Sequence, residues 1–395
     1  MAILTRQLGP EHLDLIEDAV QDAVLRALET WSFRGQPANP AGWLMQVARN
    51  RALDRLREGA LHEQKLRSLA GILEQVDAVD QDPAQAELRL LLLCCHPALA
   101  SRSRVALALK TVGGFGVGEI ARAFLMEPAA VAQVLVRAKR TLRSADAAFE
   151  LPVEAALDDR IESALETVYL LFNEGYTATS GERLVREDLC VAAIRFGELM
   201  AGEPATARPE VNALLALMYF QGSRLQARTD AAGDLLLLAD QDRNRWDQTM
   251  IVAGMQALDR SATGPRETVW HLEAAIAACH AVAPDLESTD WPRVLQLYDR
   301  LLELKDSPVV RLNRAVALAR VKGPRAALTV LDGVATHPAM ARYALLYAAR
   351  ADSLEAMSDR DGAVEALTRA IALAGTDPER RLLEERLTKL TKAGG

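Results

Sequence analysis

Hydrophobic residues recur at helical spacing along almost the whole chain. Between clusters of Gly, Pro and polar residues, apolar positions return every three or four residues, and no convincing run alternates as a β-strand would. Val, Ile and Thr are sparse beside Ala, Leu, Glu and Arg, which favour helices. The pattern therefore predicts an all-α protein.

The breaks between helices indicate several domains, as expected for 395 residues at about 150 residues per domain. Residues 1–58 hold two strong helices, and residues 59–85 have the charged, Ala-rich composition of a linker. Residues 86–148 are predicted to form a basic helical domain. A helical extension follows over residues 149–285, and residues 286–395 contain an internal repeat.

The repeat consists of two stretches that recur at an offset of 36 residues. Residues 314–318 match residues 350–354, and residues 325–328 match residues 361–364. Hairpins of two helices at this spacing resemble tetratricopeptide repeats, which span about 34 residues. Two unrelated antiparallel helix pairs are the alternative, because Ala-rich helices readily resemble each other.

The first strong helix, predicted over residues 11–31, combines a buried stripe with an acidic face. Its apolar positions are Leu13, Ile16, Val20, Ala23, Ala27 and Trp31. The opposite face carries Glu11, Asp14, Asp18 and Asp22, with Gln21 beside them. Like charges four residues apart cost roughly 0.2–0.5 kcal/mol per pair in an isolated helix. This face is therefore either a docking surface for a basic partner or a solvated acidic surface.

The second helix begins at Pro40, behind a favourable N-cap residue, Asn39. Its buried stripe is Leu44, Ala48, Ala52 and Leu56. A second face gathers Trp43, Gln46, Asn50, Asp54 and Arg57, flanked by Arg49, Arg51 and Arg55. An aromatic ring, an amide and several guanidinium groups suit unpaired DNA, since the ring stacks on a base and Arg neutralises phosphate. The alternative is a helix whose Trp43 is largely core and whose arginines pair with Asp54.

A basic segment interrupts a chain whose net charge is −8. Between Ser101 and Arg143 the only acids are Glu119 and Glu127. The bases in the same stretch are Arg102, Arg104, Lys110, Arg122, Arg137, Lys139, Arg140 and Arg143. Acids dominate from residue 150 to residue 240. Such a local excess of positive charge indicates nucleic-acid binding in spite of the total.

Two helices joined by Met126 and Glu127 are predicted inside this basic segment. The first begins at Val117, and the second begins at Pro128. Their inward positions are Ile120, Ala121 and Phe124, then Val131, Leu135, Ala138 and Leu142. The outward face of the second helix bears Ala130, Gln133, Arg137 and Arg140, with Lys139 and Arg143 to the side. In a helix-turn-helix such a face enters the major groove of DNA; an ordinary hairpin with a basic surface is the alternative.

Composition argues against several other classes of protein. No apolar run approaches the 18 or so residues of a membrane-spanning helix, and no signal-peptide pattern is present, so a cytoplasmic protein without a membrane partner is expected. The adjacent Cys94 and Cys95 make a poor chelate, and they are expected to pack in a Leu-rich helix that stops at Pro97. No usable catalytic or nucleotide-binding motif appears, so we expect no metal, no cofactor and no enzymatic activity.

These segments together resemble the extracytoplasmic-function RNA polymerase sigma factors. Residues 16–23 and 43–54 resemble sigma domain two, and residues 119–139 resemble sigma domain four. Further resemblance extends to a subgroup with a long C-terminal extension of tetratricopeptide-like repeats, through residues 169–176, 186–190, 240–243 and 274–280. In the family a helix precedes the segment at residues 2–5, so domain two is expected to be shortened at its N-terminus.

The resemblance implies a protein that binds core RNA polymerase and directs transcription from specific promoter DNA. It assigns polymerase binding to Asp14, Asp18, Gln21 and Asp22. It assigns the minus-ten element to Trp43, Gln46, Arg49, Asn50, Arg51, Asp54 and Arg55. It assigns the minus-thirty-five element to Ala130, Gln133, Arg137, Lys139 and Arg140.

The extension is expected to regulate this activity, with a peptide or protein as the candidate ligand of its repeats. The alternative function is a one-component helix-turn-helix transcription regulator with a helical sensor domain. That alternative explains the basic segment and the tail, but it leaves the helix around Arg49, Asn50 and Arg51 unexplained.

Overall fold

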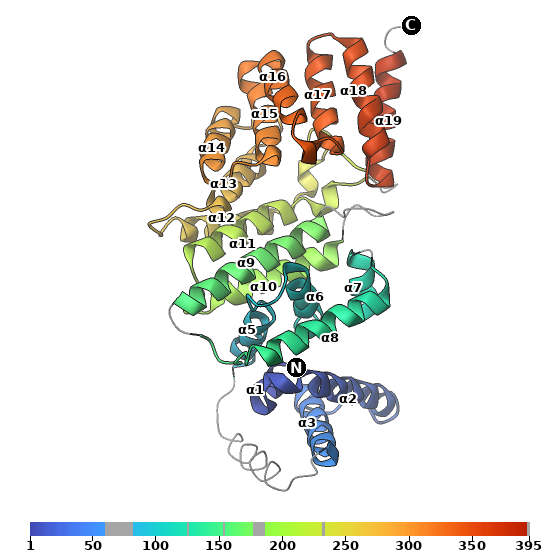
Figure 1. The fold of residues 1–395 in the computed structure, drawn as a ribbon, viewed down its shortest axis with the longest axis vertical. Coiled ribbons are helices and arrows are strands. Elements are labelled where there is room, and N and C mark those ends of the chain that lie inside the picture. Colours follow the sequence, from blue (N-terminus) through green and yellow to red (C-terminus); the bar gives the residue numbers. More distant parts are fainter. Residues whose placement is uncertain (60–81, 125, 153–154, 177–185, 231–233, 393–395) are drawn as a thin grey trace. The chain divides into compact units, whose positions relative to one another are not determined.

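A computed structural model describes residues 1–59, 82–124, 126–152, 155–176, 186–230 and 234–392 (Figure 1). Over these residues the chain is all-α, as predicted, and the only β-pairing is an isolated bridge between Thr229 and Leu235. The chain divides into two compact units, Met1–Leu170 and Leu171–Gly395. Within the described ranges, no helix is both long and apolar enough to cross a bilayer. Most of the predicted linker, residues 60–81, lies outside the described residues.

The described residues of the first unit form helices of different lengths. They are α1 (Ala2–Leu8), η1 (Pro10–His12), α2 (Leu13–Arg34), α3 (Pro40–Gly59), α5 (Pro83–Cys94), α6 (Ser101–Thr111), α7 (Val117–Phe124), α8 (Pro128–Ser144) and the first part of α9 (Ala155–Tyr176). The helix α1 is only seven residues long, and its Leu4 and Leu8 are buried against α2 and α3.

The pair α2 and α3 forms as the sequence predicts. Ile16, Ala19 and Ala23 of α2 share a core with Ala48 and Ala52 of α3. The predicted N-cap is confirmed, because the N–H of residue 42 donates a hydrogen bond of 2.9 Å to the side-chain oxygen of residue 39. At the C-terminal end of α2, Gly35 adopts a φ of +76°, which glycine reaches without a steric penalty.

The helix α5 carries the two adjacent cysteines into the core. It ends at Cys94, before Pro97, and both Cys94 and Cys95 are fully buried, which confirms the packing expected from sequence. Burial raises the pKa of both thiols, that of Cys95 to about 11. Both thiols are therefore protonated and inert at neutral pH.

The helices α7 and α8 match the predicted pair closely. Their starts lie at Val117 and Pro128. The predicted inward positions of α8 are buried, namely Val131, Leu135, Ala138 and Leu142. The two helices pack against each other, and both contact α6.

The first half of α9 belongs to the same unit. Arg160 donates a hydrogen bond of 3.0 Å to the carbonyl of Leu92, and the Ser163 hydroxyl donates one of 2.6 Å to the carbonyl of Cys95. Arg104 of α6 reaches the carbonyl of Ser163 at 3.2 Å. Because of these contacts, the first unit continues beyond residue 148, the C-terminal bound predicted for the basic helical domain.

The second unit begins in the middle of α9, and the regular elements of its described residues are helices. They are α10 (Glu187–Gly202), α11 (Pro209–Gly222), η3 (Leu225–Ala227), η4 (Arg243–Arg245), α12 (Gln248–Ser261), α13 (Val269–Val282), α14 (Trp291–Leu304), α15 (Pro308–Lys322), α16 (Pro324–Ala335), η5 (Pro338–Met340), α17 (Ala344–Ala356), α18 (Arg360–Leu373) and α19 (Asp377–Lys392). The helix α11 is buried on nearly every side, because α10, α12 and α13 all pack against it.

The C-terminal helices repeat in position as well as in sequence. The helix α17 begins 36 residues after α15, and α18 begins 36 residues after α16. Equivalent positions are buried alike, as in Ala315 with Ala351 and Leu331 with Leu367. Successive helices from α14 to α19 pack side by side in chain order (Figure 1). The structure thus contains two matching helix pairs.

Candidate nucleic-acid interface

The predicted minus-ten residues share one long helix, α3. Gln46, Asn50, Arg51 and Asp54 are exposed. The amide of Gln46 donates a hydrogen bond of 3.1 Å to the side-chain oxygen of Asn50. Trp43, Arg49 and Arg55 are only half exposed. The face therefore offers two amides and charged groups to solvent, with the aromatic ring set at its edge.

Trp43 is held by a second tryptophan. Its ring lies 5.5 Å from the ring of Trp31, measured between centroids, with the planes tilted by 59°. Such tilted aromatic pairs add roughly 0.5–1.5 kcal/mol beyond the area they bury. The half-buried position of Trp43 agrees with the alternative in which much of its surface is core. Its remaining surface still faces solvent.

The acidic face of α2 pairs with arginines of α3. Asp22 lies 2.8 Å from Arg51 and 3.3 Å from Arg55, and Asp18 lies 2.7 Å from Arg55. The hydrogen bond from Arg51 is the main reason that the pKa of Asp22 lies below its ordinary value. Of the arginines around Asp54, Arg57 contacts it, at 3.4 Å. The aspartates of α2 were predicted to bind polymerase, and the arginines of α3 were predicted to bind DNA. Within the chain, these opposite charges partly neutralise each other.

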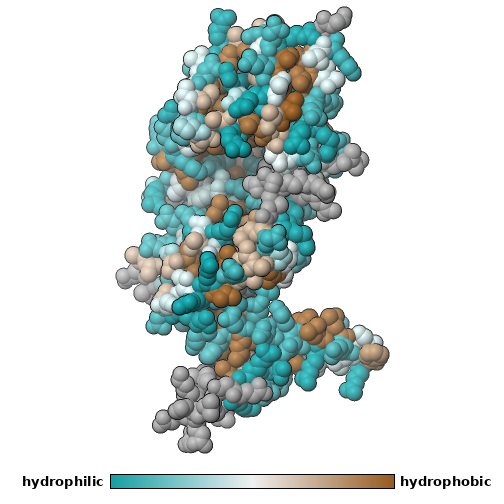
Figure 2. All heavy atoms as spheres, turned by 45° about the vertical axis from the view of Figure 1, so that its right-hand side comes forward, coloured by the Kyte–Doolittle hydropathy of each residue, from teal (hydrophilic) through white to brown (hydrophobic). Residues whose placement is uncertain are grey.

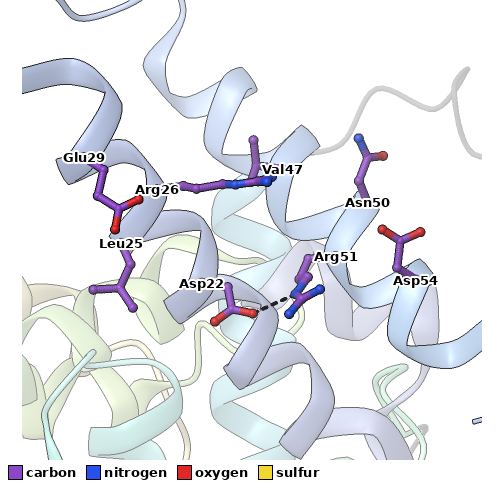
Figure 3. A pocket seen from close by; sticks show the side chains of 8 residues that line it. All are labelled: Asp22, Leu25, Arg26, Glu29, Val47, Asn50, Arg51 and Asp54. Atoms are coloured by element: carbon purple, nitrogen blue, oxygen red, sulfur yellow. Dashed lines mark hydrogen bonds and ion pairs between the residues drawn. The ribbon is translucent and has the colours of Figure 1, made fainter. Parts of the chain in front are cut away.

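A pocket of about 390 Å³ opens between these two helices. Figure 3 shows Asp22 of α2 pointing toward Arg51 of α3 across this pocket, with Asn50 and Asp54 further along α3. Its remaining lining residues are Leu25, Arg26, Glu29 and Val47. The walls of the pocket therefore carry both acidic and basic side chains.

The second half of α2 carries a hydrophobic surface that was not predicted from the sequence. Leu25 is 59% exposed and Leu28 is 64% exposed, and Val24 and Phe33 are exposed near them. Figure 2 shows hydrophobic residues gathered at its lower right, on the side where α2 lies in Figure 1. A cluster of exposed apolar side chains typically marks a protein-binding surface. The sequence contains one signal for this surface, because these apolar residues lie outside the buried stripe of α2.

The outward face of α8 holds most of the predicted minus-thirty-five residues. Gln133, Arg137 and Arg140 are exposed, and Ala130 is half exposed. Lys139 differs from the expected position, because its side chain is only 10% exposed. Its ammonium lies 2.8 Å from Asp14 and 2.7 Å from Glu17, both of α2. Lys139 thus joins α8 to the acidic helix.

Glu17 is the centre of this contact. Its carboxylate also lies 2.8 Å from the ammonium of Lys110 on α6. Burial opposes the ionisation of Glu17, but Lys110 and Lys139 outweigh it, so the pKa of Glu17 lies below its ordinary value. Burial likewise opposes the charge on Lys139, but Asp14 and Glu17 keep its pKa above the ordinary value. Three elements of the first unit therefore meet at a partly buried charge network.

The basic segment is only partly a basic surface. Arg104, Lys110 and Lys139 turn inward and pair with Glu166 or Glu17, and Arg143 approaches Asp14 at 3.6 Å. The arginines that remain exposed without an ion pair, among the residues described, are Arg102, Arg122, Arg137 and Arg140. Also within the described residues, no three His, Cys, Asp or Glu side chains gather as a metal site requires.

Known families match two parts of the chain. Residues 2–61 match the family described as Sigma-70 region 2, and residues 160–262 match the Family of unknown function (DUF6596). The first match contains α1, α2 and α3, and with them every α2 and α3 residue discussed above. It supports a role as an RNA polymerase sigma factor, a class that associates with core RNA polymerase and promoter DNA.

A full-length relative defines the family of the whole chain. The chain is 39% identical over 386 residues to a protein of Rhizobium meliloti (strain 1021), called Uncharacterized protein R00370. The alignment covers 96% of this chain and 90% of that relative. The chain therefore belongs to the same family as R00370, and it carries a sigma-70 region 2 domain at its N-terminus.

Proposed function

We propose that the protein is an alternative-type sigma factor of the extracytoplasmic-function class, regulated by its own C-terminal extension. The observation that carries the proposal is the sigma-70 region 2 match over α1–α3, together with the polar face of α3. Its activity is the binding of two macromolecules, core RNA polymerase and promoter DNA, and not catalysis. Copurification of the full chain with core polymerase tests it, because a one-component regulator has no need of that contact.

In this proposal, α2 binds core RNA polymerase. The predicted contact residues are Asp14, Asp18, Gln21 and Asp22, and three of them already pair with cations of the chain. The exposed Leu25 and Leu28 continue the same helix and offer an apolar surface without internal partners to break. Interfaces draw most of their affinity from a few well-packed residues near the centre of the contact.

In the same proposal, α3 binds the minus-ten element and holds it open. Asn50 and Gln46 present amides that can read the edge of an unpaired base, and Arg49, Arg51 and Arg55 supply charge for phosphate. Capturing a base that has left the stack costs a few kcal/mol, which contacts in a protein pocket offset. The pocket beside Asn50 and Arg51 is the nearest candidate for such a base.

The minus-thirty-five element is recognised by α8 in this proposal. Gln133, Arg137 and Arg140 form its outer face, and the helix begins at Pro128 after a short connection from α7. Lys139 reaches a phosphate only after it leaves Asp14 and Glu17. Separation of α8 from α2 would therefore free both a DNA contact and a polymerase contact.

The extension is proposed to act as a tetratricopeptide-like regulatory domain. The matched helix pairs α15–α16 and α17–α18 support this reading, because stacked pairs form surfaces that suit a peptide or protein. A shortened chain that tests the extension has to retain the first half of α9, since Arg160 and Ser163 bond to α5 and its C-cap residue.

Replacing Arg137 and Arg140 by alanine is expected to weaken promoter binding by the holoenzyme. Each lost phosphate contact lowers the slope of log affinity against log salt by about one unit. Both side chains are exposed, so the fold of α8 is expected to persist. The measurement is a salt titration of promoter binding by the holoenzyme.

The matched control is Arg325→Ala, which removes an exposed arginine of α16 in the second unit. It is expected to leave the slope unchanged. An unchanged slope in the Arg137→Ala and Arg140→Ala double variant would remove α8 from the DNA interface.

A further inference from the structure

The segment after α11 folds back on itself in the second unit. The N–H of Leu236 donates a hydrogen bond of 2.8 Å to the carbonyl of Arg228, and the N–H of Asp247 donates one of 2.8 Å to the carbonyl of Ser223. These bonds place η3, which follows α11, beside η4, which precedes α12. The two ends of the segment therefore lie side by side.

Two arginines of this segment converge on one tyrosine. The guanidinium carbon of Arg228 lies 3.9 Å from the centroid of the Tyr176 ring, and Arg228 also bonds to the carbonyl of Tyr176. The Nε of Arg224 donates a hydrogen bond of 2.6 Å to the hydroxyl of Tyr176. Tyr176 ends α9, so the cluster is anchored to a helix of the second unit.

A third arginine is fixed at the start of η4, which lies beside η3. Arg243 donates hydrogen bonds of 2.6 Å to the carbonyls of His280 and Ala283, at the end of α13. Its guanidinium carbon lies 4.4 Å from the ring of Trp246. Burial, and then the charges of Arg224 and Arg243, lower the pKa of His280 to about 4.

No carboxylate forms an ion pair with these three arginines among the described residues. Asp285 and Glu287 influence Arg243 through space, but Asp285 accepts its close hydrogen bond from the N–H of residue 288, at 2.7 Å. Arg228 is only 8% exposed. A buried guanidinium usually has an anionic partner, because its desolvation is costly.

Buried donors also lack acceptors in this cluster. The Nη2 of Arg243 and the Nε1 of Trp246 are both buried, and neither has a hydrogen-bond partner among the described residues. Trp246 is 3% exposed, and its indole nitrogen can act only as a donor. A ligand with anionic oxygens would supply acceptors for these two donors and a charge opposite to that of the guanidinium groups.

We propose that Arg224, Arg228 and Arg243 bind the phosphate or carboxylate group of a small molecule. The planar guanidinium fork matches both groups with two parallel hydrogen bonds. The rings of Tyr176 and Trp246 hold two of the forks flat and limit their motion. The proposal does not depend on the sigma-factor assignment, because every residue in it belongs to the second unit.

Isothermal titration calorimetry of the full chain tests the site, with inorganic phosphate, pyrophosphate and citrate at constant ionic strength. Saturable binding of at least one of them is expected. Arg224→Gln should weaken that binding about tenfold or more, because a charge-assisted bond is lost. Tighter binding of phosphate and pyrophosphate identifies a phosphate ligand, and tighter binding of citrate identifies a carboxylate ligand.

The matched control is Arg311→Gln, an exposed arginine of α15 that already pairs with Asp306. It should bind as the unchanged chain does. If circular dichroism shows that Arg224→Gln is unfolded, the folded Arg224→Lys variant takes its place, and it too should bind more weakly. The proposal would be overturned if none of the three anions showed saturable binding. It would also be overturned if Arg311→Gln weakened binding as much as Arg224→Gln does. Unchanged affinity in the folded Arg224 variant would overturn it as well.

Discussion

Glutamate at both Leu25 and Leu28 is expected to reduce affinity for core RNA polymerase by about 30-fold or more. Loss of a residue that dominates an interface costs about 2 kcal/mol or more, and a buried unpaired charge adds to this cost. Both side chains are more than half exposed in the free chain, so the core of α1–α3 is not disturbed. The measurement is binding of the purified full chain to core polymerase.

The matched control is Leu345→Glu, at an exposed leucine of α17 that lies outside the sigma-70 region 2 match. It should retain full affinity. The leucines give a cleaner test than Asp18 or Asp22, since charge reversal at either aspartate also breaks its pairing with Arg55 or Arg51. Normal affinity in a folded Leu25→Glu, Leu28→Glu variant would show that polymerase docks elsewhere.

Replacing Glu17 by glutamine is expected to lower the free energy of unfolding at neutral pH by about 3 kcal/mol, because removal of one partner leaves buried charge uncompensated. Lys110 and Lys139 are 13% and 10% exposed. Without the Glu17 carboxylate, Lys139 would keep its contact with Asp14, and Lys110 would lose the carboxylate with which it pairs. Urea-induced unfolding of the full chain measures the change. Glu29→Gln is the control, since Glu29 is exposed and its loss should cost less than about 0.5 kcal/mol.

The effect of Glu17 should also depend on pH in a defined direction. Its pKa in the folded chain lies below the ordinary value of 4.5. A carboxyl group with a lowered pKa stabilises the fold above its unfolded pKa, and it loses that contribution as the pH falls through the folded pKa. The gap between Glu17→Gln and the unchanged chain should therefore narrow below about pH 4.5. A constant gap would contradict the charge network.

Local features of the fold could be predicted because they depend on neighbouring residues. The helical period and the N1 proline predict α8 from Pro128, and Asn39 caps α3 as expected. The packing of Cys94 and Cys95 follows in the same way from the leucines around them and from Pro97. In each case the residues that decide the outcome lie within one or two turns.

Partners that are distant in sequence could not be predicted. Lys139 lies 125 residues from Asp14, and the helical period alone placed its ammonium beside the outer face of α8. The same holds for Arg51 and Asp22, 29 residues apart, where only the local Asp54 was considered as a partner. Exposure of Leu28 likewise depends on which surfaces other helices cover, and that is a property of the folded unit.

Transcription by purified core RNA polymerase on fragmented genomic DNA, with and without the full chain, tests the sigma-factor assignment most directly. Sequencing of RNA 5′ ends should reveal start sites that require the chain and that share one sequence element at the minus-ten position. Asn50→Ala, a change on the exposed face of α3, should reduce those transcripts. Identical 5′ ends with and without the chain would contradict the assignment.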